Sequence, residues 1–234
     1  MSLQILHEDN HLIAINKPAG WLVQADQTGD TTLADYVKRY IKDRYDKPGD
    51  VFLGTIHRLD RPVSGVVVFA RTSKALTRMN ELFRKREIEK TYWAVVGERP
   101  QPISGTLKHL IKKDSKRNFA KIWDRPTKSS EGAKEAELSY KLIAGIGQQH
   151  LLEVKPKTGR PHQIRVQLAA LGTPIRGDLK YGYPEPNDDA SIHLHATALD
   201  FIHPVKREPV HIEAPLPEEQ IWNLFRDIEE VPNY

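Results

Sequence analysis

The feature that most constrains the fold is an apolar run, residues 65–71 (GVVVFAR), that directly follows a loop with three charged side chains. Arg58, Asp60 and Arg61 come just before this run, which is typical of a buried strand. A carboxylate beside a buried strand needs partners, because an unpaired charge is costly to desolvate. Asp60 is therefore either an ion-pair partner of a neighbouring arginine or a group that does chemistry, and this loop leaves both interpretations open.

Apolar spacing and capping residues predict the remaining elements. Strands are expected over 11–17, 65–71, 90–97, 136–144, 150–156 and 192–202, and helices over 31–45, 73–87, 161–171 and 217–228. Pro161 is expected at the first helical position of its helix, and Gly172 is expected to stop it. Residues 99–135 are rich in Pro, Gly and Lys and are expected to form long hairpin loops.

The order of these elements favours an α+β fold with a mixed, largely antiparallel central sheet and flanking helices, because strands precede helices without regular βαβ alternation. At 234 residues the chain is expected to form one domain, residues 1–234, with a basic loop insert near 99–135. Cysteine is absent, and the first residues lack the pattern of a signal peptide. A monomeric protein of the cytoplasm, without a membrane partner, is the expectation.

Positive charge is unevenly distributed. The net charge is only +4, but residues 208–234 hold seven acids and one base, so the rest of the chain carries 34 bases against 24 acids. The excess is greatest over 108–128, with eight Lys and Arg against two Asp, and over 71–90, with seven against three. Clustered positive charge is typical of a nucleic-acid binder, and a solvated basic face is the alternative.

The charged loop is suited to presenting a carboxylate. In an extended loop Arg58 and Asp60 point to one side, and His57 and Leu59 point to the other. Nearby positive charge keeps the carboxylate ionised, which suits a nucleophile better than a general acid. A salt bridge within a turn remains the alternative.

Two further segments carry candidate site residues. His162 and Arg165 lie near the amino end of the helix predicted from residue 161, where a phosphate or the Asp60 carboxylate would be favoured. A basic first turn exposed to solvent is the alternative. Tyr92 lies on a predicted strand and is either a core residue or a ring that stacks on a base and moves a proton.

Other chemistries have weaker support in the sequence. His193 and His195 form an H-x-H pair with His203 beyond it, but no third zinc ligand stands at a diagnostic spacing, and no metal is expected. There is no nucleotide-binding motif. His57, Asp60 and Ser64 carry the letters of a hydrolase triad, yet they lie within eight residues of one loop, where a relay hardly forms.

Six segments together resemble the RluA-type pseudouridine synthases, in the order of that family and over most of the chain. They are NKPAGWLV (16–23), HRLDRPVSG (57–65), KTYWAVV (90–96), KPKTGRPHQIRVQL (155–168), PIRGDLKYG (174–182) and LHATALDFIHP (194–204). The resemblance implies an isomerase that converts uridine in ribosomal RNA of the large subunit, or in tRNA, to pseudouridine without a cofactor. It also implies a stand-alone catalytic domain without the S4-type RNA-binding domain of many relatives.

The resemblance implies a role for each site residue. Asp60 would be the nucleophile, attacking C6 of the base or C1′ of the sugar. Arg165 would hold Asp60 in an ion pair, and Tyr92 would stack on the uracil and act as general base. Arg58 would fill the space left by the flipped uridine. The other substrate contacts are expected from His57, Arg61, Arg160, His162 and Gln163, and the basic insert would hold RNA through Lys112, Lys113, Lys116 and Arg117.

Rival functions remain open at this point. An RNA-binding module without catalysis would bind RNA and leave uridine unchanged. A metal-dependent hydrolase using His193 and His195 would be sensitive to chelators. A uracil glycosylase is a nearer enzyme alternative, but glycoside hydrolysis usually needs two carboxylates, and only Asp60 is well placed.

Overall fold

The structure is a computed structural model that describes residues 3–26, 29–226 and 228. The chain divides into two compact units. Unit 1 comprises Met1–Glu89 and Ala196–Pro215, and unit 2 comprises Lys90–His195 and Leu216–Tyr234. Asp60 thus belongs to unit 1, whereas Tyr92 and Arg165 belong to unit 2. The expectation of one catalytic domain stays a prediction.

Unit 1 is a sheet with two helices. Its strands are β1 (Ile5–Glu8), β2 (Leu12–Lys17), β3 (Gly54–Thr55), β4 (Ser64–Ala70), most of β10 (Leu194–Ile202) and β11 (Pro209–Glu213). The order is β1-β2-β4-β10, with β11 paired to β10 and β3 paired to β4. The pairs β1–β2, β2–β4, β3–β4 and β10–β11 are all antiparallel. The helices are α1 (Leu33–Arg44) and α2 (Ser73–Lys85).

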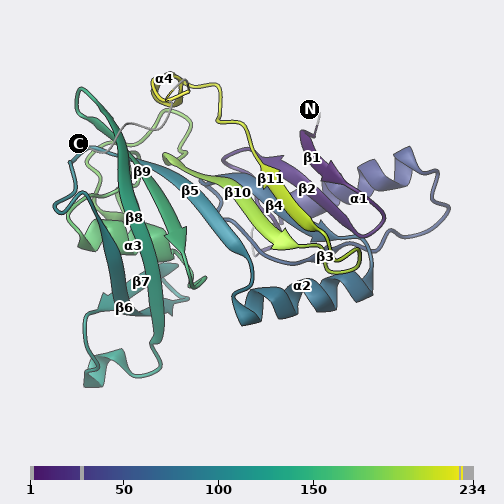
Figure 1. The fold of residues 1–234 in the computed structure, drawn as a ribbon, viewed down its shortest axis with the longest axis horizontal. Coiled ribbons are helices and arrows are strands. Elements are labelled where there is room, and N and C mark those ends of the chain that lie inside the picture. The colour runs from purple at the N-terminus through teal and green to yellow at the C-terminus, as the bar shows by residue number, and fades with distance from the viewer. Residues whose placement is uncertain (1–2, 27–28, 227, 229–234) are drawn as a thin grey trace. The chain divides into compact units, whose positions relative to one another are not determined.

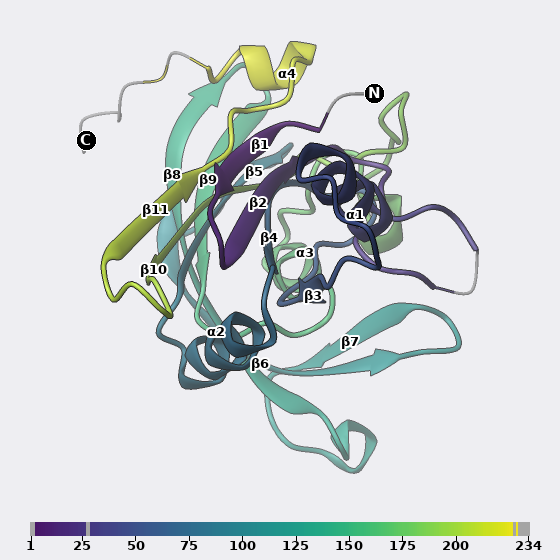
Figure 2. The ribbon, with the colours of Figure 1, turned by 90° about the vertical axis from the view of Figure 1, so that its right-hand side faces the viewer.

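Alternating side chains of β2 and β4 are buried on both faces of this sheet. On one face Leu12, Ala14, Val66 and Val68 form a core with the α2 residue Met79. The residues between them, Ile13, Ile15, Val67 and Phe69, are also fully buried. In both views α1 lies next to β1 and β2 (Figures 1 and 2). The apolar run that follows the Asp60 loop is thus the central strand β4, as the sequence predicts.

Unit 2 is built on a second antiparallel series of strands. Its strands are β5 (Glu89–Val96), β6 (Ser104–Asp114), β7 (Phe119–Trp123), β8 (Lys134–Ile146) and β9 (Gln149–Pro156), in the order β5-β9-β8-β6-β7. The helical elements are α3 (Gln163–Ala170), α4 (Gln220–Asn223) and the 3-10 turns η1 (Lys128–Ser130) and η2 (Leu179–Tyr181). Figure 1 shows β5, β9 and β8 side by side. One core cluster joins Val95 and Leu151 to Trp222 and Phe225 of the C-terminal segment.

The strands β1, β3 and β11 are not among the expected elements. Three of the expected segments also differ from the prediction. Residues 99–135 are not mainly loop, because β6 and β7 form a long antiparallel hairpin within them. The lysines on the solvated face of the hairpin hide the strand pattern. Helix α3 begins at Gln163 and not at Pro161, since His162 has a left-handed backbone with φ of 53°. The C-terminal helix spans Gln220–Asn223. It begins there because Glu219 caps the N–H groups of Ile221 and Trp222. Residue 227 of the expected helix lies outside the described residues.

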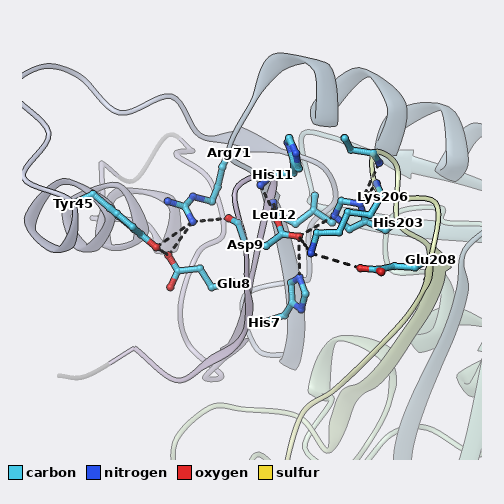
Figure 3. A network of polar contacts seen from close by, with 11 residues as sticks. His7, Glu8, Asp9, His11, Leu12, Tyr45, Arg71, His203, Lys206 and Glu208 are labelled. Carbon is cyan, nitrogen blue, oxygen red and sulfur yellow. Dashed lines mark hydrogen bonds and ion pairs between the residues drawn. The ribbon is translucent and has the colours of Figure 1, made fainter.

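A polar network ties three parts of unit 1 together (Figure 3). Asp9 accepts hydrogen bonds from the backbone N–H groups of His11 and Leu12, which closes the turn between β1 and β2. Its other carboxylate oxygen lies 3.0 Å from Lys206 Nζ and 3.1 Å from His203 Nε2. The neighbouring Glu8 pairs with Arg71, which follows β4, at 3.0 Å. The network thus fixes the first hairpin against the end of β4 and the segment that follows β10.

Candidate active site

The Asp60 loop of unit 1 is held at both of its apolar positions. Leu59 and Val63 are buried, while Arg58 is exposed and Asp60 is half-buried. The N–H of Val63 donates to the carbonyl of Asp60 at 3.1 Å, which folds the loop into a turn ahead of β4. The loop therefore presents Asp60 from a fixed backbone, with a cationic side chain two residues before it.

Lys17 of β2 holds this loop through a hydrogen bond to its backbone. Its side chain is fully buried, and its Nζ donates to the carbonyls of Pro18, Trp21 and Arg61 at 2.9, 2.9 and 3.1 Å. The pKa of Lys17 lies at about 7, because burial and the charge of Arg61 lower it more than the charge of Asp60 raises it. An ammonium with three acceptors is well satisfied in such a place. Lys17 therefore fixes the loop, and in its protonated form it places a positive charge near Asp60.

Arg61 and His57 are used within unit 1. Arg61 donates through Nε to the carbonyl of Gly20 at 3.0 Å and lies 2.9 Å from Asp30. The Nε2 of His57 accepts the N–H of Val68, and its ring stacks on Phe83 at 5.2 Å between centroids. These contacts make both side chains supports of the loop, and the substrate contacts expected of them stay predictions.

Gly65 allows the loop to enter β4 tightly. Its φ is +113°, and a Cβ at this position would lie 2.2 Å from the carbonyl oxygen of Ala196 on β10. Only glycine permits both the backbone conformation and this close approach.

In unit 2, Tyr92 lies on β5 opposite Val154 of β9 and is half-buried. Its strand neighbours Trp93 and Val95 pack into the cluster with Trp222 and Phe225. Successive side chains on a strand point to opposite faces, so Tyr92 lies on the face away from that cluster.

Arg165 of α3 forms the most deeply buried ion pair of unit 2 among the described residues. Its Nε and Nη2 donate to the two carboxylate oxygens of Asp178 at 2.7 and 2.8 Å. The side chains of Arg165 and Asp178 are 6% and 1% exposed. A two-point pair of this kind fixes the plane of the guanidinium as well as its position.

Tyr181 completes the support of Arg165. The guanidinium lies over its ring, with 5.1 Å to the centroid. The Tyr181 hydroxyl lies 2.8 Å from Nδ1 of His162 and accepts the N–H of Ala120 on β7. His162 is therefore buried against Tyr181. The segment 177–182 holds Arg165 through the carboxylate of Asp178 and the ring of Tyr181.

The loop before α3 is closed by Gln163. Its Oε1 accepts hydrogen bonds from Thr158 Oγ1 and Arg160 N–H, and its Nε2 donates to the carbonyl of Glu137. Arg160 also donates through Nε to the carbonyl of Glu135 at 2.8 Å. Gln163 thus shapes the loop from inside, while Arg160 lies at its surface.

The four predicted residues of the basic insert lie at the end of β6 and in the β6–β7 turn. Lys113, Lys116 and Arg117 are exposed, and the backbone N–H groups of Lys116 and Arg117 donate to Asp114 Oδ1 at the turn. Lys112 is exposed as well, and its Nζ donates to the carbonyl of Glu131 at 2.6 Å. All four predicted cations therefore lie at the surface of the hairpin.

The histidines considered as metal ligands have other partners. Nδ1 of His193 lies 3.0 Å from Asn187, and its Nε2 lies 2.9 Å from Glu219. Burial lowers the pKa of His193, and Glu219 acts in the opposite direction. His203 belongs to the Asp9 network. Over residues 3–26, 29–226 and 228, no three His, Cys, Asp or Glu side chains are arranged to hold a metal ion.

Sequence reasoning overlooked three supporting residues. Lys17, Asp178 and Tyr181 all lie in segments that carry the family resemblance, but their spacing does not show which side chain each supports. The signal available was the type of residue, because a lysine within a buried strand and an acid in a glycine-bounded turn both need a partner.

The family model described as RNA pseudouridylate synthase matches residues 11–170 of the chain. A relative from Vibrio parahaemolyticus named tRNA pseudouridine synthase C is 32% identical, with 99% of this chain and 98% of the relative covered. A relative from Xylella fastidiosa named ribosomal large subunit pseudouridine synthase D is 36% identical, with 93% of this chain and 67% of the relative covered.

The solved structures agree with the sequence relatives. Human RNA Pseudouridylate Synthase Domain Containing 4 is similar with a TM-score of 0.78 and 28% identity, over 98% of this chain and 95% of that one. A second structure, Human RNA Pseudouridylate Synthase Domain Containing 1, is similar with a TM-score of 0.69 and 27% identity, over 92% of this chain and 84% of that one. The predicted α+β fold with a largely antiparallel sheet is confirmed.

Proposed function

We propose that this chain, which belongs to the RNA pseudouridylate synthase family, isomerises uridines of tRNA or of large-subunit ribosomal RNA to pseudouridine with Asp60 as nucleophile. The observation that carries the proposal is the family match over residues 11–170, which include Asp60, Tyr92 and Arg165. The relatives named for tRNA and for the large ribosomal subunit support these two RNA classes.

The reaction rearranges two bonds and conserves the atoms of the nucleoside. The bond between N1 of uracil and C1′ of ribose breaks, C5 then bonds to C1′, the proton on C5 leaves, and N1 gains a proton. Asp60 attacks C6 or C1′ and is released at the end. Its fixed loop supports this role, because a carboxylate held in place loses little freedom on reaction.

Tyr92 and Arg165 are proposed as the other two catalytic groups. Tyr92, on the face of β5 away from the cluster with Trp222, stacks on the uracil and removes the proton from C5. Arg165 supplies positive charge to the reacting carboxylate, and its two-point contact with Asp178 supports this role by fixing the guanidinium.

RNA contacts are proposed for Arg58, Arg160 and the cations of the basic insert. Arg58 replaces the flipped uridine in the RNA stack, which offsets part of the cost of flipping. Arg160 and the insert residues Lys112, Lys113, Lys116 and Arg117 contact phosphates. We expect the enzyme to act as a monomer in the cytoplasm. No helix of the described residues has the length and apolar character needed to cross a membrane.

The test is base-resolution mapping of pseudouridine in total RNA from cells that lack this protein, complemented with the wild type or with Asp60→Ala. The expected result is that the wild type restores specific sites in tRNA or ribosomal RNA and the variant does not. Restoration by both would remove Asp60 as nucleophile. Restoration by neither would favour an RNA-binding module, and chelator-sensitive hydrolysis would favour the hydrolase.

A further inference from the structure

A hollow of about 390 Å³ lies along β7, and the proposed reaction does not use it. Strand β7 lines it along its whole length, from Phe119 to Trp123, and Ser129 and the α3 residue Val166 complete its wall. All of these residues belong to unit 2. The size is that of a small-molecule site and not of a groove for a duplex.

Trp123 is held in place at the end of this hollow. Its indole N–H donates to Ser129 Oγ at 3.1 Å, and Ser129 Oγ lies 2.9 Å from Thr127 Oγ1. Ser129 lies in the 3-10 turn η1, which is closed by Ser130, whose Oγ accepts the N–H of Thr127 at 2.8 Å. The indole N–H is therefore engaged by Ser129, and the half-buried ring of Trp123 contributes aromatic surface to the lining of the hollow.

The charge beside Trp123 indicates an anionic ligand. Lys121 lines the hollow, is exposed, and is paired across the hairpin with Lys112. Two like charges directly opposite each other on neighbouring strands destabilise a hairpin. An anion bound beside Lys121 would offset this repulsion. Residues 108–128 as a whole carry eight basic against two acidic side chains.

We propose that this hollow binds an unpaired nucleobase of the substrate RNA, stacked on Trp123, with Lys121 contacting the adjacent phosphate. An aromatic face beside a cation is the combination by which proteins bind single-stranded nucleic acid. The proposal rests on the proposed function in taking RNA as the ligand, and it adds a subsite that holds a nucleotide other than the reacting uridine.

A protein strand is the rival occupant, because β7 is the last strand in the order of unit 2. Part of that edge is already covered, since the N–H of Ala120 donates to the Tyr181 hydroxyl at 2.8 Å. The positive charge of the hairpin and the exposed Lys121 favour RNA over a neutral strand.

The test compares two ligands of equal charge, a single-stranded RNA octamer and an abasic ribose-phosphate chain of the same length. Trp123→Leu keeps an apolar side chain and removes the aromatic face, and Trp123→Phe keeps an aromatic face. We expect Trp123→Leu to weaken binding of the octamer about 10-fold and to leave the abasic chain unchanged. Trp123→Phe should stay within about threefold of the wild type for both, and Lys121→Gln should weaken both alike.

Equal affinity of the wild type and Trp123→Leu for the octamer would overturn the proposal, and so would an equal loss for both ligands. Isomerisation of uridine by the wild-type preparation is measured in parallel. If the wild type isomerises uridine while Trp123→Leu binds the octamer normally, only this subsite is lost. If the wild type does not isomerise uridine but binds bases through Trp123, the subsite stands and the proposed reaction fails. A thermal unfolding curve shows that each variant is folded, and Trp123→Phe provides the second variant.

Discussion

At the scale of single residues, the pair between Arg165 and Asp178 is the feature on which the proposed chemistry most depends. Asp178 receives two of the N–H donors of Arg165, and Tyr181 lies beneath the guanidinium. A cation of such low exposure is tolerated only when its partners are well placed. We therefore regard Asp178 as a positioning residue, which acts through Arg165 and not on the uridine.

Replacing Asp178 by Asn is expected to lower both stability and turnover. The free energy of unfolding should fall by about 3 kcal/mol, because removing one partner of a buried ion pair leaves the other poorly compensated. Turnover should fall by about 100-fold with little change in KM, since a small displacement of the guanidinium affects the transition state more than binding. Urea unfolding and single-turnover kinetics measure the two effects. Asp188→Asn, a change of an exposed residue further along the chain, is the control and should alter neither stability nor turnover.

At the scale of elements, the network around Asp9 joins the first hairpin to the segment 203–208 (Figure 3). Burial raises the pKa of Asp9, but the N–H groups of His11 and Leu12 together with Lys206 and His203 outweigh this effect and hold it well below its ordinary value. The ionised carboxylate therefore stabilises the folded state. This contribution is present above the ordinary pKa of 3.8 and is lost as the pH falls below it.

Asp9→Asn tests this dependence on pH. At pH 7 the variant should be less stable than the wild type by about 2 kcal/mol, the size expected for hydrogen bonds to a charged group. At pH 3 the difference should be smaller, because the carboxylate of the unfolded wild type takes up its proton near the ordinary pKa of 3.8 while the folded one is still ionised. Chemical unfolding at both pH values measures this, with the exposed Asp43→Asn as control. A difference that grows toward pH 3 would contradict the assignment.

Some helices and strands of the structure can be predicted from the sequence, and others cannot. Helix α1 is predictable because Thr32 and Asp35 form a capping box ahead of an apolar stripe, and β4 because its run is uninterrupted. The β6–β7 hairpin cannot be predicted in this way, because its exposed lysines make residues 108–128 resemble a loop. Helix α4 begins later than its apolar spacing suggests, because its N-cap lies at Glu219.

The residues of the candidate site likewise fall into those that the sequence indicates and those that it does not. Asp60, Tyr92 and Arg165 lie within motifs that a single sequence displays, although their roles remain proposals. The supports do not follow from spacing. Lys17 reaches a carbonyl 44 residues away, and Asp178 lies 13 residues from Arg165, so only the folded chain brings each to its partner.

At the scale of the whole molecule, the uneven charge governs how RNA is bound. Outside the acidic residues 208–234 the chain has a clear basic excess, and the exposed tip of the β6–β7 hairpin carries three of these cations. Phosphate contacts release counterions, so affinity falls with salt in proportion to the number of contacts.

The triple variant Lys113→Gln, Lys116→Gln, Arg117→Gln is expected to bind RNA more weakly and with less dependence on salt. If all three side chains contact phosphates, the slope of log affinity against log salt should decrease by about 2. Binding titrations of a tRNA and a ribosomal RNA fragment at several salt concentrations measure the slope. Neutralising three exposed cations elsewhere, Lys38, Lys42 and Lys74, is the control. The same slope for the hairpin variant and the wild type would exclude the hairpin tip from the RNA interface.

The most direct test of the central claim is the release of tritium from RNA labelled at C5 of uridine. Formation of the bond between C5 and C1′ expels the hydrogen on C5, so release reports the isomerisation itself. We expect release by the purified wild-type protein from tRNA or large-subunit ribosomal RNA. We expect none from Asp60→Asn, which keeps the size of the side chain and its loop. Release by Asp60→Asn at the wild-type rate would show that Asp60 is not the nucleophile.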